Sequence, residues 1–539
     1  MCVLAALPAV AGAATPPRME LLSQSFRGGF PNGPSADATI SGDRQLATLA
    51  AFDSDASNIV KGDRNGFRDV FLVHRAKPYS LKGEPWKRGK TTLVTRGRGG
   101  RPANGNSYLP DLDGGQTHSP RCVAFISDAS NLVGGDTNGV ADAFVKNLRT
   151  GRIKRVSVNS SGVQADGASY EVKVDAHCDR VAFVSDATNL ALTGTSKLAW
   201  KGSVTSRPGA GTKQVYVRIL GYETDNTGLS GLTFLASASP TGEAGNGSSD
   251  EVAFARAGGG CGRQGRCGNF SGESVFFTSR ATNLSAADTD PGVDVYQRAF
   301  PRRFVRIRFP RSRHIDGESV RSTLVGVGPL QTATKLISVT QAGERGNGPS
   351  DQPAATDAGN YVVFRTAATN LFHGDVNGVT DVVREDTRDG SIGLFSRTDG
   401  GTVANRASAQ PAIGRTGQDI VFESDASNFD GNDKNCTGDI YHLDIPANHQ
   451  LLASLDSMNH VPNAPFGTSE TCPQAIAAPL TNPAVSLYLN YLVLDSSYLL
   501  LDHRAASKAF PHLSAAAAAY ASSTNPKLRQ VYLRYVGPR

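Results

Sequence analysis

Short runs of apolar and polar residues follow one another along almost the whole chain. Val, Phe, Tyr and Ile are the usual apolar members, as in Val123-Ala124-Phe125-Ile126 and in Asp69-Val70-Phe71. Clusters of Gly, Asn, Asp and Pro separate these runs, a combination that is typical of short β-strands joined by tight turns. Helical periodicity is confined to one short candidate helix at 513–521. The pattern therefore predicts an all-β chain.

One ten-residue segment occurs in seven copies. It reads VAFISDASNL at 123–132 and VAFVSDATNL at 181–190, and the last copy, YLVLDSSYLLL at 491–501, keeps only the apolar part. Such a period indicates a repeat architecture, in which each unit buries its faces against its neighbours. An anchor residue marks the same position in each copy: Phe52, Phe125, Phe183, Phe277, Phe364, Phe422 and Val493.

Each repeat predicts about four strands, which is the composition of a β-propeller blade. A strand that begins at an acidic residue, such as Asp142 or Asp381, follows the anchor, and a further strand and turn come after it. A propeller closes its ring because a free sheet edge invites pairing with other chains. Since the last copy lacks its final strand, Leu21–Ser25 is expected to complete the blade formed by Ala484–Val536. The prediction is a seven-bladed β-propeller of four-stranded antiparallel blades, closed by the N-terminal strand.

The recurring motifs can be written together as VAFxSDAxNL, GDxNGxxDxF, RVSV and GxxxNGxS. This set resembles the TolB-like, WD40-like β-propeller repeats of exported bacterial proteins, and the resemblance covers nearly the whole chain after residue 13. It implies a protein-interaction scaffold, because the propellers of this family serve mainly in that role. We expect no counterpart of the separate N-terminal domain of TolB, since the repeats begin close to the N-terminus.

The N-terminus has the features of a targeting segment. Residues 1–14 read MCVLAALPAVAGAA, and Ala11-Gly12-Ala13 fits the small-x-small cleavage site of a signal peptide. A frayed apolar terminus is the alternative. The expected organisation is a signal peptide at 1–13 and one propeller domain at 14–539, with insertions at 191–231, 258–268 and 300–325. No apolar run is long enough for a transmembrane helix, so we expect an exported, periplasmic or extracellular monomer.

The cysteines agree with export. Removal of Cys2 leaves an even number, which in an exported chain indicates disulfides. Reduced, buried thiols are the alternative, and no CxxC pair with zinc-ligand spacing occurs. Short spacing favours Cys261–Cys267 and Cys436–Cys472, which leaves Cys122 to pair with Cys178.

The repeated acidic turns are the most regular polar feature. The motif GDxNGxxD places three oxygen side chains at positions one, three and seven, which is compatible with a calcium loop. A bidentate Glu is missing, and Asx side chains that bond nearby backbone amides explain the motif as a tight turn. Calcium is thus the one cofactor that the sequence leaves open. The candidate ligands are Asp63, Asn65, Asp69, Asp136, Asn138, Asp142, Asp375, Asn377 and Asp381.

The sequence contains no familiar catalytic motif. There is no GxSxG elbow, and Asp113–Thr117 lacks the Ser and Trp of a sialidase Asp-box. The ten histidines stand at unrelated places, such as His118, His177, His373 and His442, without an HExxH or HxH pair. The sequence therefore predicts no catalytic residue.

The insertion at 300–325 is rich in arginine. Arg302, Arg303, Arg306 and Arg308 alternate with apolar residues, which predicts a protruding basic hairpin. Such a hairpin is either a solvated surface element or a contact for an anionic glycan, lipid or protein. A net charge of +6 over 539 residues does not indicate a nucleic-acid partner.

Three hypotheses about function follow from the sequence. The first is a non-catalytic scaffold that binds a protein, glycan or other ligand at the channel mouth or at inserted loops. The second is a glycan lyase or hydrolase that uses channel residues, and the third is a calcium-stabilised structural propeller. Unique polar residues clustered at one channel mouth would favour the second.

Overall fold

The structure is a computed structural model of the chain. It describes residues 19–43, 46–79, 86–114, 119–191, 206–220, 231–255, 274–299, 304–315, 318–326, 334–414, 416–430, 433, 438–452, 481–485, 491–496 and 530–535. Within 304–326 and 481–535 the description covers the backbone alone. The predicted signal peptide lies outside these residues, as do Cys261, Cys267, Cys436 and Cys472.

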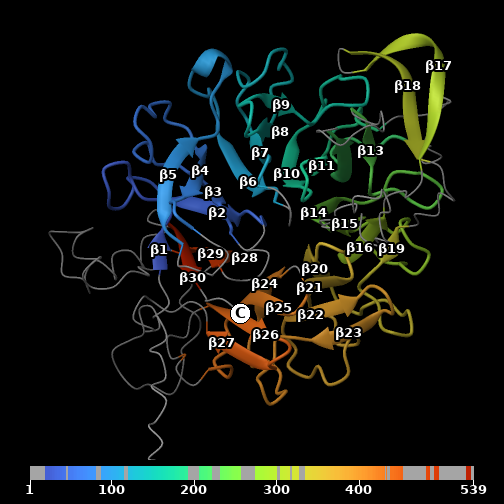
Figure 1. The fold of residues 1–539 in the computed structure, drawn as a ribbon. Helices are drawn as coiled ribbons and strands as arrows, with labels where there is room; N and C mark the ends of the chain where they lie inside the picture. Colours follow the sequence, from blue (N-terminus) through green and yellow to red (C-terminus); the bar gives the residue numbers. More distant parts are fainter. Residues whose placement is uncertain are drawn as a thin grey trace, which may run out of the picture.

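The fold is an all-β propeller with four-stranded antiparallel blades (Figure 1). Six blades are described with their side chains. Blade 1 consists of β2 (Ser35–Ile40), β3 (Leu49–Ser54), β4 (Asp69–Arg75) and β5 (Arg88–Leu93). Blade 2 consists of β6 (Ser107–Leu112), β7 (Cys122–Ser127), β8 (Asp142–Asn147) and β9 (Ile153–Arg155). Blade 3 consists of β10 (Ser169–Val174), β11 (Arg180–Ser185), β12 (Gln214–Ile219) and β13 (Thr233–Leu235).

Blades 4–6 continue the same order around the ring. Blade 4 consists of β14 (Ser249–Phe254), β15 (Ser274–Ser279), β16 (Asp294–Ala299) and β19 (Lys335–Leu336). Blade 5 consists of β20 (Ser350–Ala355), β21 (Tyr361–Thr366), β22 (Asp381–Asp386) and β23 (Ser391–Leu394). Blade 6 consists of β24 (Ser408–Ile413), β25 (Asp419–Ser424), β26 (Asp439–Asp444) and β27 (His449–Leu452). The predicted basic hairpin is present as β17 (Phe304–Ile315) and β18 (Glu318–Gly326), inserted in blade 4.

The two ends of the chain meet in one further sheet. It has the order β1 (Met19–Leu21), β30 (Gln530–Tyr535), β29 (Tyr491–Ser496), β28 (Thr481–Val485), and Met19 pairs with Arg534. Strand β28 contacts both β2 and β24, so this sheet lies between blades 1 and 6. The N-terminal strand therefore joins the C-terminal strands as expected, but it ends at Leu21, whereas the prediction began there.

The repeats predict seven blades, and this number needs correction. Six blades are described with their side chains. The seventh copy, anchored at Val493, has lost the Ser-Asp-Ala-x-Asn part of the motif, and its strands β28–β30 are described by backbone pairing alone. The sheet that contains β28–β30 therefore lacks the motif that orders the six blades.

The core lies between adjacent blades. The anchor Phe125 is fully buried and stacks on Phe144 with ring centroids 5.7 Å apart, and Phe183 stacks on Tyr216 at 5.6 Å. Most apolar clusters combine two neighbouring blades, as when Leu72 of blade 1 packs with Phe125 of blade 2. Because both faces of a blade are covered, the central strands are continuous apolar runs.

Two contacts fix blades and termini to one another. Cys122 at the start of β7 forms a disulfide with Cys178, which precedes β11, so the bond joins blades 2 and 3; this is the pairing that the sequence predicts. Arg88 on β5 holds the N-terminal segment to blade 1: its backbone N–H donates to Glu20 Oε1 at 3.1 Å, and its Nη2 donates to the Gln24 carbonyl at 3.1 Å. In the described part of the chain no helix is long and apolar enough to cross a membrane.

Candidate functional site

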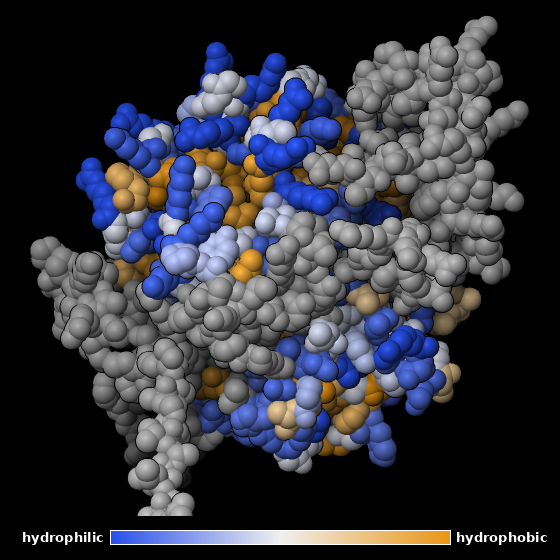
Figure 2. Space-filling model, viewed as in Figure 1, coloured by the Kyte–Doolittle hydropathy of each residue, from blue (hydrophilic) through white to orange (hydrophobic). Residues whose placement is uncertain are grey.

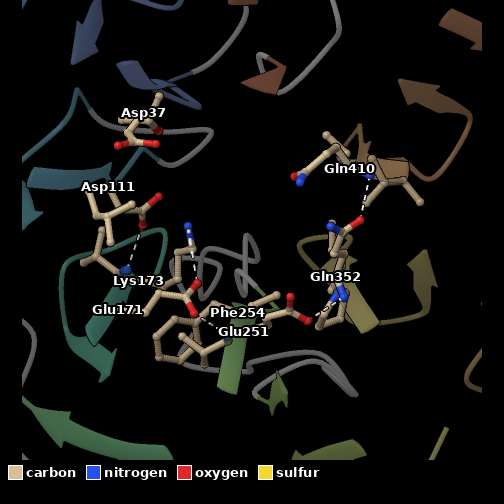
Figure 3. A pocket seen from close by; sticks show the side chains of 18 of the residues that line it. Asp37, Asp111, Glu171, Lys173, Glu251, Phe254, Gln352 and Gln410 are labelled. Atoms are coloured by element: carbon tan, nitrogen blue, oxygen red, sulfur yellow. Dashed lines mark hydrogen bonds and ion pairs between the residues drawn. The ribbon is translucent and has the colours of Figure 1, made fainter. Parts of the chain in front are cut away.

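The innermost strand of each described blade lines a central channel. A cavity of about 560 Å³ lies between β2, β6, β10, β14, β20 and β24 (Figure 3). The side chains around it come from one strand of each blade, so the ring gathers residues that are far apart in sequence. A ligand-sized cavity therefore lies on the propeller axis.

A β-bulge near the start of each inner strand decides which side chains reach the channel. In β2, for example, the pairing register with β3 shifts between Ala36 and Thr39. The third residue of five of these strands has a left-handed backbone, although none is glycine: φ is 50° for Asp37, 51° for Leu109, 49° for Glu251, 54° for Gln352 and 50° for Gln410. Bulges re-aim side chains next to functional sites, and such a conformation costs of order 1–3 kcal/mol at each non-glycine residue.

The side chains at the bulges connect one blade to the next. Glu171 Oε2 accepts the Val252 N–H at 3.1 Å, Glu251 Oε2 accepts the Gln352 N–H at 2.7 Å, and Gln352 Oε1 accepts the Gln410 N–H at 2.8 Å. We call this chain of bonds the inter-blade belt. Two blades use Glu as the acceptor and one uses Gln, so the belt requires an acceptor oxygen and not a negative charge.

The channel is acidic. The described residues that line it include five carboxylates and a single lysine, Lys173, whose Nζ lies 3.8 Å from Glu171 Oε1. Carboxylates that face one another across a low-dielectric cavity raise the local density of cations. The five carboxylates are Asp37, Asp111, Glu171, Glu251 and Asp357.

Burial and mutual repulsion act on these carboxylates. Burial, followed by repulsion from Asp351 and Glu171, raises the pKa of Glu251 to about 7, although the Gln352 N–H and Arg365 act in the opposite direction. Burial also raises the pKa of Glu171, while Lys173 lowers it. A cation placed in the channel would relieve the repulsion between these carboxylates. The channel therefore favours the binding of a positively charged group.

A second cavity of about 450 Å³ adjoins the channel between blades 1 and 2. The two cavities share Asp37 and Leu109, and Asp55, Arg68, Asn106 and Tyr108 complete the lining of the second. Arg68 donates its Nε and Nη2 to Asp53 at 2.8 and 2.5 Å and also lies 3.7 Å from Asp37 and 3.8 Å from Asp55, so one cation faces three carboxylates. This side cavity is therefore also acidic in balance.

Two tyrosines from neighbouring blades stand at the same mouth. Tyr108 donates its hydroxyl to Asp128 at 3.3 Å, and Tyr170 donates to Asp186 at 2.8 Å. Lys213 Nζ lies 4.4 Å from the centre of the Tyr170 ring, so this ring face accepts a cation within the protein itself. The mouth thus offers carboxylates and aromatic faces together.

The acidic turns predicted from the sequence lie elsewhere. They connect the second and third strands of their blades and are not among the channel-lining residues. In three blades the Asn amide donates to the Asp that starts the next strand: Asn65 to Asp69 at 2.7 Å, Asn138 to Asp142 at 3.1 Å, and Asn377 to Asp381 at 2.9 Å. Thr95, Ser157 and Ser396, each two residues after the end of the outer strand, donate to the same aspartates.

Cations of the protein occupy two of these turns. Arg155 Nη1 lies 3.0 Å from Asp136 and 3.1 Å from Asp142, and in blade 4 Arg345 pairs with Asp288, Asp290 and Asp294. Asp63 and Asp375 lie beside Asn65 and Asn377; burial raises the pKa of both, and Arg96 lowers that of Asp63. The described residues hold no group of three or more His, Cys, Asp or Glu side chains placed to bind a metal. Calcium binding at these turns stays a prediction.

The channel residues escape sequence reasoning, although a trace of them is visible there. Every described inner strand begins with Ser, and its third residue is Asp, Leu, Glu or Gln. A search aligned on that Ser, instead of on the Phe anchors, finds the acidic position. His118 lies outside the described residues, and His177, His373 and His442 do not line the channel.

No family model matches the chain, and no curated protein matches it. Solved structures are similar at the level of the fold. They include an oligogalacturonate lyase from Vibrio parahaemolyticus (10% identity, TM-score 0.43, 97% of each chain covered), TolB from Acinetobacter baumannii (10%, 0.31, 74% of this chain and 61% of that one) and the β-propeller domain of the Trilobed protease from Pyrococcus furiosus (10%, 0.31, 82% and 100%). The β-propeller fold follows from the strand pairing of the chain itself, and its function from its own site.

Proposed function

We propose that the protein is a non-catalytic binding scaffold whose channel holds a cationic group of its partner, such as the basic side chains of a peptide segment. The observation that carries this proposal is the balance of five carboxylates against one lysine around the channel cavity. The side cavity with Asp37 and Asp55 extends the acidic surface toward blades 1 and 2. A partner with two or more positive charges fits both cavities at once.

The lining chemistry supports binding over catalysis. Among the described residues that line the channel there is no His, Cys, Ser or Arg. Two of the carboxylates, Glu171 and Glu251, each use one oxygen in the inter-blade belt, and Asp111 accepts the Val174 N–H at 2.8 Å. A glycan lyase or hydrolase remains the alternative, and an anionic glycan is disfavoured by the charge of the channel.

We extend the proposal to the closure of the ring, to export and to the oligomeric state. The sheet of β1 and β28–β30 closes the ring, since it contacts blades 1 and 6. The disulfide between Cys122 and Cys178 is in keeping with export to an oxidising compartment. The protein works there as a monomer that presents the channel mouth to its partner.

Peptide binding tests the proposal. A fluorescent tetra-arginine peptide is titrated with the protein in an anisotropy assay, and tetra-glutamate serves as the charge-reversed probe. Glu251→Gln keeps the belt acceptor, as Gln352 does naturally, and removes one charge. We expect tetra-arginine binding to weaken about tenfold in the double variant Asp37→Asn, Glu251→Gln, in line with the loss of two partly buried ion pairs.

The control variant adds a negative charge at the inter-blade belt instead of removing one. Gln352→Glu adds a carboxylate to the channel, and we expect it to strengthen the binding of tetra-arginine. Equal affinity of wild type and double variant, or tighter binding of tetra-glutamate than of tetra-arginine, contradicts the proposal. Cleavage of a panel of neutral and acidic oligosaccharides by the wild type would favour the enzyme alternative.

A further inference from the structure

The side cavity between blades 1 and 2 brings together two kinds of side chain. Charged groups come from blade 1, and an amide and a tyrosine come from the beginning of blade 2: they are Asp37, Asp55, Arg68, Asn106 and Tyr108. The volume of about 450 Å³ lies within the range of about 300–1,000 Å³ that is typical of small-ligand pockets. In Figure 2, hydrophilic side chains project from the part of the molecule where Figure 1 places blades 1 and 2. A polar or charged ligand therefore suits this part of the protein.

Arg68 shows that the blade 1 side of the cavity accepts a guanidinium group. Its side chain donates twice to Asp53 Oδ1, while Asp53 Oδ2 accepts the Leu109 N–H at 2.9 Å. The backbone N–H of Arg68 donates to Asn106 Oδ1 of blade 2 at 3.0 Å. Arg68 is thus held by both blades and forms a fixed part of the wall. Because it faces three carboxylates, these four groups together carry a negative charge, which a second cation would offset.

Tyr108 supplies the aromatic surface of the cavity. Its side chain packs on the apolar cluster between blades 2 and 3, and its hydroxyl donates to Asp128. Tyr170 is the matching residue of blade 3, since both tyrosines are the second residue of an inner strand. Lys213 Nζ lies 4.4 Å from the centre of the Tyr170 ring, so a tyrosine at this position of a blade binds a cation. In blade 2, Ala141 stands where Lys213 stands in blade 3, directly before the third strand, and so supplies no such cation for Tyr108.

A guanidinium group uses such surroundings better than an ammonium group does. It is planar, so it stacks on an aromatic ring and donates parallel N–H bonds to a carboxylate, whereas lysine acts as a strongly hydrated point charge. Both interactions occur elsewhere in this propeller. Arg365 donates to the two oxygens of Asp351 at 2.6 and 2.5 Å, and the guanidinium carbon of Arg384 lies 4.3 Å from the centre of the Tyr361 ring. The side cavity offers a carboxylate and a tyrosine around one space, so a single arginine side chain can make both interactions there.

We propose that the side cavity binds an arginine side chain of the partner in preference to lysine, with its guanidinium group stacked on Tyr108 and paired with Asp55. Asp55 is the more exposed of the two lining carboxylates, at 47% of its side chain against 24% for Asp37. Asp37 and Leu109 line both cavities, so a peptide segment in the channel has the side cavity beside it. The inference rests on the proposed function, since it names the residue type that the acidic mouth selects. Tyr108 is then the residue that determines this specificity.

Two peptides of equal charge separate this inference from the proposed function. Tetra-arginine and tetra-lysine are titrated with the full-length protein in the anisotropy assay, at about 0.1 M salt, where charges more than about 10 Å apart are largely screened. We expect tetra-arginine to bind about tenfold more tightly than tetra-lysine. Equal affinities overturn the preference for arginine and leave the proposed function intact, whereas binding of neither peptide overturns both.

Substitutions of the two tyrosines test the assignment to the side cavity. Tyr108→Phe keeps the ring, and we expect it to keep the preference for tetra-arginine. Tyr108→Leu removes the ring, and we expect the two peptides then to bind equally, with the affinity for tetra-lysine unchanged. Tyr170→Leu is the matched control, because it removes the equivalent ring, on which Lys213 already lies, and it should keep the preference. A preference that survives in Tyr108→Leu, or that both leucine variants lose equally, overturns the assignment.

Asp55→Asn provides a second test that does not depend on the packing of Tyr108. The substitution neutralises a half-exposed side chain, and we expect it to reduce the preference for tetra-arginine while the melting temperature stays that of the wild type. An unchanged preference overturns the pairing with Asp55. Displacement of bound tetra-arginine by maltohexaose, a neutral oligosaccharide, overturns the choice of arginine as the ligand of the side cavity.

Discussion

Replacement of Glu251 by Gln tests the description of the channel through stability. Burial raises the pKa of Glu251 to about 7 from an ordinary value of 4.5. The folded protein therefore holds this proton more tightly than the unfolded chain does. The resulting stabilisation is complete below about pH 4.5 and is lost as the pH rises through about 7. Glutamine does not titrate, so the variant lacks this pH dependence.

The size of the effect follows from the pKa. A rise from 4.5 to about 7 corresponds to at most about 3 kcal/mol of unfolding free energy. Relative to wild type, Glu251→Gln is expected to be about equally stable at pH 4.5 and more stable by up to this amount at pH 8. The belt is preserved, because the Gln oxygen can accept the Gln352 N–H as Gln352 accepts that of Gln410.

Urea unfolding at pH 5 and pH 8 measures the difference. Glu251→Ala is the control, because it removes the charge together with the acceptor. The Gln352 N–H then loses its partner, which costs about 1–3 kcal/mol at either pH. The reasoning is refuted if Glu251→Gln has the same stability relative to wild type at both pH values, or if it is less stable at pH 8.

Three further predictions concern the rest of the fold. Deletion of Met19–Ser25 should lower the melting temperature measured by calorimetry, because β30 loses its edge partner, and Arg88→Met should lower it by a smaller amount; an unchanged value contradicts closure by the N-terminus. Asp136→Ala should cost about 0.5–2 kcal/mol, with no effect of chelator; a calcium-dependent rise in melting temperature that this substitution abolishes would support the calcium alternative. A thiol reagent should label no cysteine of the mature protein, and free thiols would count against export. The double variant Cys122→Ser, Cys178→Ser should lose about 4 kcal/mol of unfolding free energy, for a sequence separation of 56 residues.

Much of the fold is predictable because the repeats encode it. Phe52, Phe125 and Phe183 mark the central strands correctly, since a side chain covered on both faces of a blade must be apolar. The N-terminal strand is displaced by a few residues from its expected position, and its pairing partner is right. Alternation identifies a strand but does not fix where its hydrogen bonds to a distant strand begin.

The channel is harder to read from the sequence for a physical reason. A β-bulge changes the direction of a side chain without any mark in the alternation of polar and apolar residues. Glu251 and Gln352 adopt a left-handed backbone that favours glycine or asparagine, so nothing in their identity predicts it. The regular acidic turns attract attention instead, because their oxygen spacing is conspicuous, yet Asn65 and Asn138 use it to order their own turns.

The location of a bound cationic peptide tests the central claim most directly. A tetra-arginine peptide with a photoreactive group is cross-linked to the full-length protein, and the modified residues are mapped by mass spectrometry. The account predicts cross-links within the inner strands β2, β6, β10, β14, β20 and β24, which decrease in the Asp37→Asn, Glu251→Gln variant. Cross-links confined to the outer strands, or undiminished in that variant, would contradict it.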